Sequence, residues 1–210
     1  MQPLISIMSC HVHRRWQQQL RETWLKECPV DYRFFLGSPG LKDAKDDEVL
    51  LDAPDTYEDL SSKVQAAYRW VVAHGYNHTF KCDVDTYVCV PRLLRSGFEG
   101  HDHIGQRGVG GNNQPYGGSG YWLSRRALEF LASAPCSRDT RCYNVEDWWV
   151  WATLSFNSVC PTEHDDRYSM TEGKMPIPDN NIITYHPHTL PTTERLTGIR
   201  AVHERGKEIK

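Results

Sequence analysis

Two carboxylates, Asp83 and Asp85, stand in the otherwise apolar and β-branched stretch HTFKCDVDTYVCV, residues 78–90. Side chains two residues apart in a strand point to the same face, so we expect both carboxylates to project together while Val84 packs the other way. At about 4 Å and an effective dielectric near 20, their repulsion is on the order of 4 kcal/mol, which requires a nearby cation or a raised pKa. A divalent ion whose remaining ligands are substrate phosphates meets that requirement.

The same pair has a plain structural alternative. A DxD pattern by itself more often caps a turn or forms an ion pair, for which Lys81 and Arg92 are the nearest partners in the sequence. The pattern therefore indicates a metal site only in combination with its surroundings.

Further blocks of sequence surround the carboxylate pair in a definite order. They are RRWQQQLRETW (14–24), FFLG (34–37), DAPDTYEDLSSK (52–63), QPYGGSGYWLS (114–124) and VEDWW (145–149). Together with FKCDVDTYVCV they resemble the blocks of the β1,3-galactosyltransferase and fringe-type enzymes, glycosyltransferase family 31. The resemblance runs from about residue 4 to residue 155, nearly three quarters of the chain.

This resemblance implies a GT-A fold, a UDP-sugar donor and a Mn²⁺ ion, with Mg²⁺ as the alternative, between the DxD carboxylates and the diphosphate. It implies Asp85 as the first metal ligand, and Asp83 as a ligand directed to the ribose or to a metal-bound water. It also implies a late histidine ligand. In TYHPHTL (184–190) we prefer His186 for this role over His188.

The resemblance further implies that Asp147 is the catalytic base and that Glu146 helps to hold the acceptor. A carboxylate suits this chemistry because a sugar hydroxyl must lose its proton as it attacks the anomeric carbon. The structural alternative is a pair of acidic residues that complements the dipole at a helix N-terminus. The family's E-D-V is E-D-W here, and Trp148, Trp149 and Trp151 crowd one helix, where core packing is the commoner role and sugar stacking the alternative.

Other residues match positions that bind the nucleotide sugar in this family. Glycines in the 114–124 block would let the backbone approach a sugar, or would serve a tight turn. The expected nucleotide-sugar ligands, besides the DxD pair, are Ser9, Arg14, Arg15, Asp55, Lys63, Lys81, Gly118 and Gly120.

We therefore expect a Mn²⁺-dependent hexosyltransferase that moves galactose, glucose or an N-acetylhexosamine from UDP to a hydroxyl of a carbohydrate or glycoprotein, with inversion. The alternatives are a retaining transferase on the same fold and an idle module that binds UDP-sugar or carbohydrate. Paired carboxylates also serve two-metal nucleotidyl transfer or phosphate hydrolysis, but the sequence lacks a third acidic residue in a recognisable motif of that kind.

The elements that must position these residues alternate in type. Apolar runs at 4–9, 31–37, 48–53 and 78–85 predict strands, and four-residue spacing of apolar residues from Arg14 to Glu27 and from Tyr57 onward predicts helices. This alternation predicts an open, mostly parallel, twisted sheet flanked by helices, with ligands beyond the carboxyl ends of the strands. The GT-A resemblance adds a small second sheet near the DxD motif.

Composition limits the remaining possibilities. The 210 residues suit one domain, with a nucleotide-binding half at about 1–100, an acceptor half at about 101–190 and a polar tail at about 191–210. With 24 basic and 27 acidic residues and no basic run, nucleic-acid binding is disfavoured.

The N-terminus does not resemble a signal peptide, and no apolar run is long enough to span a bilayer. We therefore expect a soluble protein of a bacterial cytoplasm or a virus-infected host cytoplasm, unless the sequence is a domain of a longer or anchored protein. Seven cysteines, an odd number without a CxxC pair, favour reduced thiols, although Cys136 and Cys142 could close a local loop.

Overall fold

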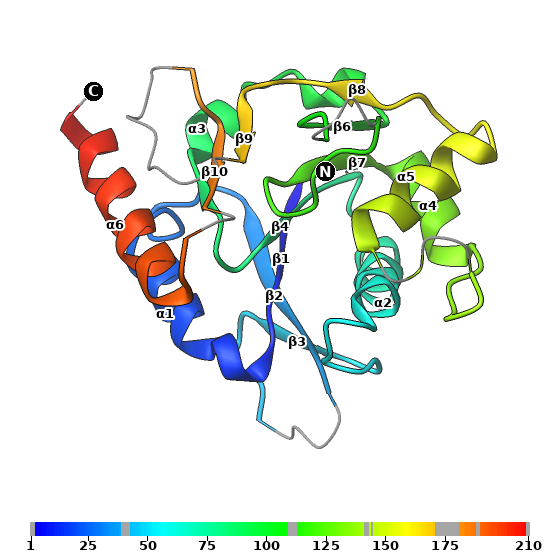
Figure 1. Cartoon of the computed structure of the whole chain (residues 1–210), viewed down its shortest axis with the longest axis horizontal. Coiled ribbons are helices and arrows are strands. Elements are labelled where there is room, and N and C mark those ends of the chain that lie inside the picture. The colour runs from blue at the N-terminus through cyan, green and yellow to red at the C-terminus, as the bar shows by residue number, and fades with distance from the viewer. Residues whose placement is uncertain are drawn as a thin grey trace.

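A seven-stranded sheet with the order β3-β2-β1-β4-β7-β6-β8 forms the centre of the computed structural model (Figure 1). The structure describes residues 3–38, 43–108, 113–140, 143, 145–170, 181–187 and 190–208. The strands of the sheet are β1 (Leu4–Met8), β2 (Asp31–Gly37), β3 (Glu48–Leu51), β4 (His78–Asp83), β6 (His103–Gly105), β7 (Tyr121–Ser124) and β8 (Glu163–His164). Strands β3, β2, β1 and β4 are parallel, whereas β7 is antiparallel to both of its neighbours.

Strand β1 is the middle of the parallel part, and all five of its residues are buried. A strand that is apolar along its whole length needs cover on both faces of its sheet. Helix α1 (Arg14–Glu22) covers one face, where Trp16 and Leu20 pack on Ile5 and Ile7. Helices α2 (Leu60–Ala73), α4 (Arg125–Ser133) and α5 (Glu146–Phe156) cover the other face (Figure 1).

A second sheet of three strands has the order β5-β10-β9. Its strands are β5 (Tyr87–Val88), β9 (Tyr168–Met170) and β10 (Thr184–His186). Strand β5 begins two residues after Asp85, so the carboxylate pair lies where the chain passes from the large sheet to the small one. The predicted fold class, a mostly parallel sheet flanked by helices with a small second sheet beside the DxD motif, is confirmed.

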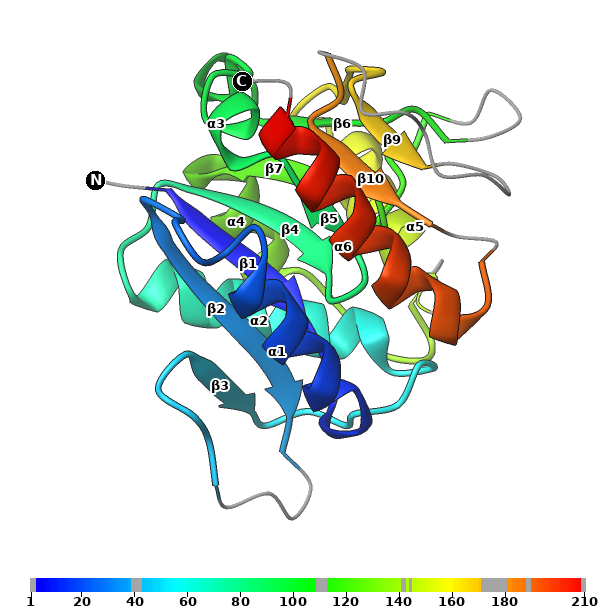
Figure 2. The same cartoon turned by 90° about the vertical axis from the view of Figure 1, so that its left-hand side faces the viewer.

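The C-terminal segment, predicted only as a polar tail, is helical. Residues Thr192–Glu208 form helix α6, which lies beside α1 on the same face of the large sheet (Figure 2). Ile199 and Val202 are buried in this helix, so one apolar side holds it to the protein. Short elements complete the described part: η1 (His11–His13), α3 (Val90–Leu93) and η2 (Phe98–Gly100).

Two predictions fall partly outside the described residues. Cys142 is one of the undescribed residues, so its pairing with Cys136 stays a prediction; no two of the six described cysteines form a disulfide with each other. His188, the alternative late histidine, is also outside the described part. Among the described helices, none has the length and apolar character that crossing a membrane requires.

Candidate active site

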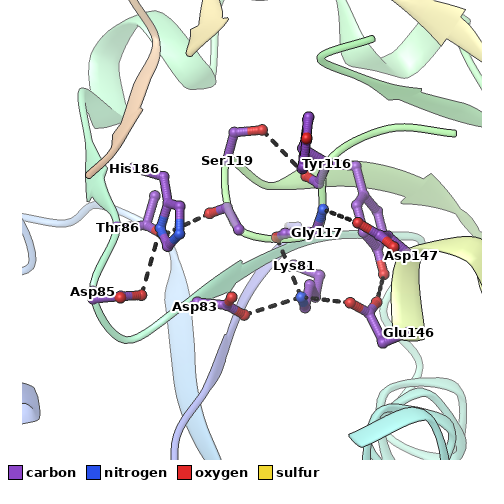
Figure 3. Close-up of polar contacts among 12 residues, drawn as sticks. Lys81, Asp83, Asp85, Thr86, Tyr116, Gly117, Ser119, Glu146, Asp147 and His186 are labelled. Carbon is purple, nitrogen blue, oxygen red and sulfur yellow. Dashed lines mark hydrogen bonds and ion pairs between the residues drawn. The ribbon is translucent and has the colours of Figure 1, made fainter. Parts of the chain in front are cut away.

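The carboxylate pair occupies the end of β4 and the turn that follows. Strand β4 ends at Asp83, the backbone N–H of Val84 donates to Met8 O, and the N–H of Thr86 donates to Asp83 O at 3.1 Å. This turn separates the two side chains: Asp83 is directed to Lys81 and Asp85 to His186 (Figure 3). The expectation that both carboxylates share one strand face is therefore wrong, because the strand ends before Asp85.

The RETW block has a direct structural role in this turn. Trp24 lies just beyond the end of α1 and is buried in the core. Its indole N–H donates to the backbone carbonyl of Thr86 at 3.1 Å. A buried indole needs such an acceptor, so the tryptophan fixes the backbone directly after Asp85.

Asp85 and His186 come together across the two sheets. Asp85 Oδ1 lies 3.5 Å from His186 Nδ1, and both side chains are more than nine-tenths buried. The Thr86 hydroxyl lies 3.3 Å from the same nitrogen and donates to Gly118 O at 2.7 Å. A Cβ at position 118 would lie 2.6 Å from His186 Nε2, so the imidazole can occupy this place only beside a glycine.

The donors present agree with a hard divalent ion. Carboxylate oxygens suit Mg²⁺ and Mn²⁺, which take one or two protein carboxylates and complete their shell with water and phosphate oxygens. Among the described residues, no group of three or more His, Cys, Asp and Glu side chains stands ready to hold a metal. Asp85 and His186 have the donor atoms to hold such an ion as two of its ligands.

Arg195 is a residue of this site that the sequence analysis missed. Its Nη1 donates to Asp85 Oδ2 at 2.7 Å, and its Nε donates to Leu190 O at 2.8 Å. It comes from α6, the segment interpreted as a tail. The signal that could have revealed the helix is the three-residue spacing of Ile199 and Val202.

Lys81 forms a buried charge network beneath the site. Its ammonium donates to Asp83 Oδ1 at 3.0 Å, Glu146 Oε2 at 2.9 Å and Gly117 O at 3.2 Å (Figure 3). Although burial opposes the charge, the carboxylates of Asp83 and Glu146 raise the pKa of Lys81 well above its ordinary value. The hydroxyl of Tyr121 donates to Glu146 Oε1. These contacts hold Lys81, its three partners and Tyr121 in place at the end of β4.

Asp147 lies on α5 beside this network, and its side chain faces the cavity described below. Its Oδ2 accepts from the N–H of Gly117 at 3.0 Å and its Oδ1 from the N–H of Trp148 at 2.8 Å. Burial raises the pKa of Asp147 in spite of these two hydrogen bonds and of the charge on Lys81. A carboxylate with a raised pKa at a cavity wall is the kind of group that accepts protons in catalysis.

Asp55 and Lys63 form a second group of contacts, which connects the end of β2, the residue after β1 and helix α2. Asp55 Oδ1 accepts from the N–H of Gly37 at 2.9 Å and from Lys63 Nζ at 3.0 Å. Lys63 Nζ also donates to Ser9 O at 2.9 Å. Lys63 lowers the pKa of Asp55 against the effect of burial, so this carboxylate remains charged.

Nearby, the ring of His13 stacks on the ring of Trp16, with 4.5 Å between centroids. The sequence analysis did not select this pair.

One cavity of about 570 Å³ connects these groups. That volume lies within the roughly 300–1,000 Å³ of ligand sites. The predicted site residues that line the cavity are Ser9, Asp55, Lys63, Asp83, Asp85, Gly118, Asp147 and His186. Residues that line it without having been predicted include His13, Trp16, Val145 and Arg195.

Five predicted site residues do not line the cavity. Lys81 and Glu146 lie beneath it, with side chains at most 4 % exposed, so the structure places neither in direct contact with a ligand there. Arg14 donates to Glu48 Oε2 at 2.8 Å, and Arg15 is exposed to solvent. Gly120 has a φ of +88° and packs against Phe80. It therefore serves a tight turn, which was the structural alternative for the glycines of this block.

Comparison with solved structures identifies the fold. The chain is similar to a glycosyltransferase involved in the glycosylation of the major capsid of PBCV-1, with a TM-score of 0.57 and 14 % identity over 95 % of this chain and 100 % of that one. It is also similar to a protein assigned as a nucleotide-diphospho-sugar transferase from Desulfovibrio desulfuricans G20 (TM-score 0.53, 10 % identity, 78 % of this chain and 79 % of that one). An active-site mutant of LgtC matches with a TM-score of 0.51 and 10 % identity over 94 % of this chain and 95 % of that one.

No protein-family model matches the chain, and no curated protein sequence matches it. Membership of the β1,3-galactosyltransferase and fringe family therefore stays a prediction from the ordered blocks. At these identities the structural likeness concerns the fold alone. The fold of this chain is that of the GT-A glycosyltransferases.

Proposed function

We propose that the chain is a metal-dependent glycosyltransferase that moves a hexose from a UDP-sugar to a hydroxyl of a carbohydrate or glycoprotein. The observation that carries the proposal is the composition of one cavity. A candidate metal pair, Asp85 and His186, and a candidate base, Asp147, line the same space at the junction of two sheets. The GT-A fold of the chain agrees with this assignment.

Asp85 and His186 would hold Mn²⁺, or Mg²⁺ in its place. When bound, such an ion supplies positive charge that polarises phosphate oxygens and favours departure of a diphosphate. Asp83 keeps one carboxylate oxygen on Lys81, and its side chain is 30 % exposed toward the cavity. This exposed part would accept hydrogen bonds from a ribose.

The nucleoside part would lie at the end of the cavity formed by Ser9, His13, Asp55 and Lys63. His13 presents a flat ring on the cavity wall, and burial lowers the pKa of this histidine, which favours its neutral form. A neutral aromatic surface suits stacking of a base. Asp55 and Lys63 are paired to each other, so their part is to hold the walls together.

Asp147 would accept the proton of the acceptor hydroxyl. As that proton moves to the carboxylate, the hydroxyl oxygen forms a bond to the anomeric carbon, and the bond between that carbon and the diphosphate oxygen breaks. A base on the side opposite to the leaving group gives inversion of the anomeric configuration. Asp147 lies on α5, whereas the candidate metal pair comes from the β4–β5 turn (Asp85) and from β10 (His186).

The direct test is product formation from a panel of UDP-sugars with Mn²⁺, compared with the same panel in EDTA. We expect release of UDP with Mn²⁺ and a large loss in EDTA, together with an NMR spectrum that shows an inverted anomeric centre. A product that retains its configuration would exclude Asp147 as the base. Turnover that is equal in EDTA would exclude the metal.

A further inference from the structure

Helix α5 carries a series of aromatic side chains that begins beside Asp147. The rings of Trp148 and Trp151 meet edge to face, with 5.6 Å between centroids and an interplanar angle of 84°. Trp151 in turn meets Phe156 at 5.5 Å and 67°. These rings follow one side of the helix away from the cavity, and α5 itself lies at the outer side of the molecule (Figure 1).

This aromatic side begins next to two residues of the cavity wall. Val145 and Asp147 both line the cavity, and Val145 is 49 % exposed. Trp151 follows Asp147 by four residues, which places the two side chains one above the other on the helix. Trp148 follows Asp147 directly, and the backbone N–H of Trp148 donates to the carboxylate of Asp147. A molecule that extends from the cavity past Asp147 along α5 would therefore reach Trp151, whose ring contacts that of Trp148.

Core packing explains only one of the tryptophans of this helix. Trp149 is fully buried, packs in the apolar cluster below α5 and donates its indole N–H to Pro135 O at 3.2 Å. Trp148 and Trp151 are half-buried, and among the described residues neither belongs to the two buried apolar clusters. Neighbouring large aromatic residues on an exposed side of a helix indicate a binding surface.

We propose that Trp148 and Trp151 form a platform for the acceptor, which is a neutral pyranoside. The inference rests on the proposed function, since it takes Asp147 as the base. A pyranose has a face of C–H groups that packs on an indole ring, while its hydroxyls remain free for hydrogen bonds. The edge-to-face pair offers one ring face and one ring edge at a right angle, which suits the face and rim of a sugar ring.

The charges beside the platform favour a neutral sugar over an acidic one. Asp147 and Glu146 stand at the N-terminal end of α5, and Lys81 is already shared by Glu146 and Asp83. A uronic acid or sialic acid would bring a further carboxylate towards Asp147, which is unfavourable at short distance. Hexosides such as glucosides, galactosides and mannosides lack that penalty.

Saturation-transfer NMR with methyl glycosides of glucose, galactose, mannose and glucuronic acid tests the platform, each in the presence of UDP and Mn²⁺. The variants are Trp148→Ala and Trp151→Ala, with Trp151→Phe as a conservative variant that keeps an aromatic ring. The matched control is Trp70→Ala, because Trp70 is another half-buried tryptophan that stacks on His74 at 3.6 Å away from the cavity. Binding of UDP with Mn²⁺ is measured on every variant by calorimetry.

We expect the wild type and Trp70→Ala to bind at least one neutral glycoside and to bind the glucuronide more weakly. Trp151→Ala and Trp148→Ala should bind that glycoside about tenfold more weakly, as the loss of one aromatic contact predicts. Trp151→Phe should keep most of the affinity. Binding of UDP with Mn²⁺ should be unchanged in all variants.

Three results would overturn the platform while the proposed function stands. The first is binding of UDP by the wild type without any response to the neutral glycosides. The second is equal glycoside binding by the wild type and both alanine variants. The third is a dimer that Trp151→Ala dissociates, which would assign the surface to a second copy of the chain. Glycoside binding that needs both tryptophans in a protein that does not bind UDP would instead overturn the proposed function alone.

Discussion

At the scale of single residues, the site depends on a lysine that no ligand can reach. Lys81 is fully buried and is shared by Asp83, Glu146 and the Gly117 carbonyl. Removal of one partner from a buried ion pair leaves the other charge without compensation. Lys81 therefore acts through position: it joins the DxD turn to the helix that carries the candidate base.

Replacement of Lys81 by methionine should lower the free energy of unfolding by about 3–5 kcal/mol, because Glu146 then stays buried and unpaired. The double variant Lys81→Met/Glu146→Leu should be more stable than Lys81→Met, since Asp83 is partly exposed and can be hydrated. Chemical denaturation of the wild type, both single variants and the double variant measures this coupling. Additive losses in the double variant would contradict a shared network.

The pH dependence of turnover should follow the ionisation of Asp147. A base must be unprotonated, so the rate should fall as pH falls through the pKa of this group. Burial and the charge of Asp83 raise that pKa, while Lys81 and the N–H groups of Gly117 and Trp148 lower it, with a net increase. The acid limb of kcat should therefore lie at a higher pH than that of an exposed aspartate, near 3.9.

The variant Asp147→Asn provides the matching control for this limb. We expect a loss of about 10²- to 10⁴-fold in kcat, no change in UDP binding and a residual rate without the acid limb. A variant that keeps the same limb as the wild type would assign the ionisation to another group.

At the scale of elements, helix α6 places an arginine on the carboxylate of Asp85, the candidate metal ligand in the β4–β5 turn. Arg195 of α6 donates to Asp85 Oδ2, whereas His186 Nδ1 lies 3.5 Å from Oδ1 of the same carboxylate. A cation bound to Asp85 must share that carboxylate with the guanidinium. The position of α6 and metal binding are therefore coupled in this account.

The variant Arg195→Ala should bind Mn²⁺ more tightly than the wild type when no nucleotide is present. A charge-assisted hydrogen bond contributes about 1.5–3 kcal/mol, so an increase of roughly tenfold is expected for this partly exposed pair. Titration with Mn²⁺ followed by electron paramagnetic resonance measures the affinity without turnover. Arg200→Ala is the control, because Arg200 lies on the same helix and pairs with Glu22 at the surface. Weaker Mn²⁺ binding by Arg195→Ala would show that the arginine does not oppose the metal.

Local elements of this fold could be predicted from the sequence, whereas contacts between distant elements could not. The apolar run of β1 and the carboxylates at the end of β4 are local patterns, so the sheet and the place of these carboxylates at the end of a strand could be predicted from the sequence. The ion pair of Lys81 with Glu146 joins residues 65 apart, and that of Arg195 with Asp85 joins residues 110 apart. Neither has a local signal. Helix α6 was missed for a related reason: packing on α1 stabilises it, and its own composition is mostly polar.

At the scale of the whole molecule, two sheets meet at the DxD turn, and a cavity lies between the C-terminal end of β1, α5 and α6. Parallel strands bring Asp83 beside Met8 in register, and the small sheet brings His186 from about one hundred residues later in the chain. The GT-A fold thus gathers donors that are distant in sequence. The central claim of this account is that the gathered donors bind a nucleotide diphosphate together with a metal.

That claim is tested most directly by thermal unfolding with UDP, GDP and CMP, each with and without Mn²⁺, on the wild type and on Asp85→Asn. A ligand at 100 times its Kd stabilises a protein by about 2.7 kcal/mol, which corresponds to an increase of several degrees in Tm. We predict this increase for the wild type with UDP and Mn²⁺ together, and its loss in Asp85→Asn. No increase with UDP and Mn²⁺, or the same increase in Asp85→Asn, would contradict the account.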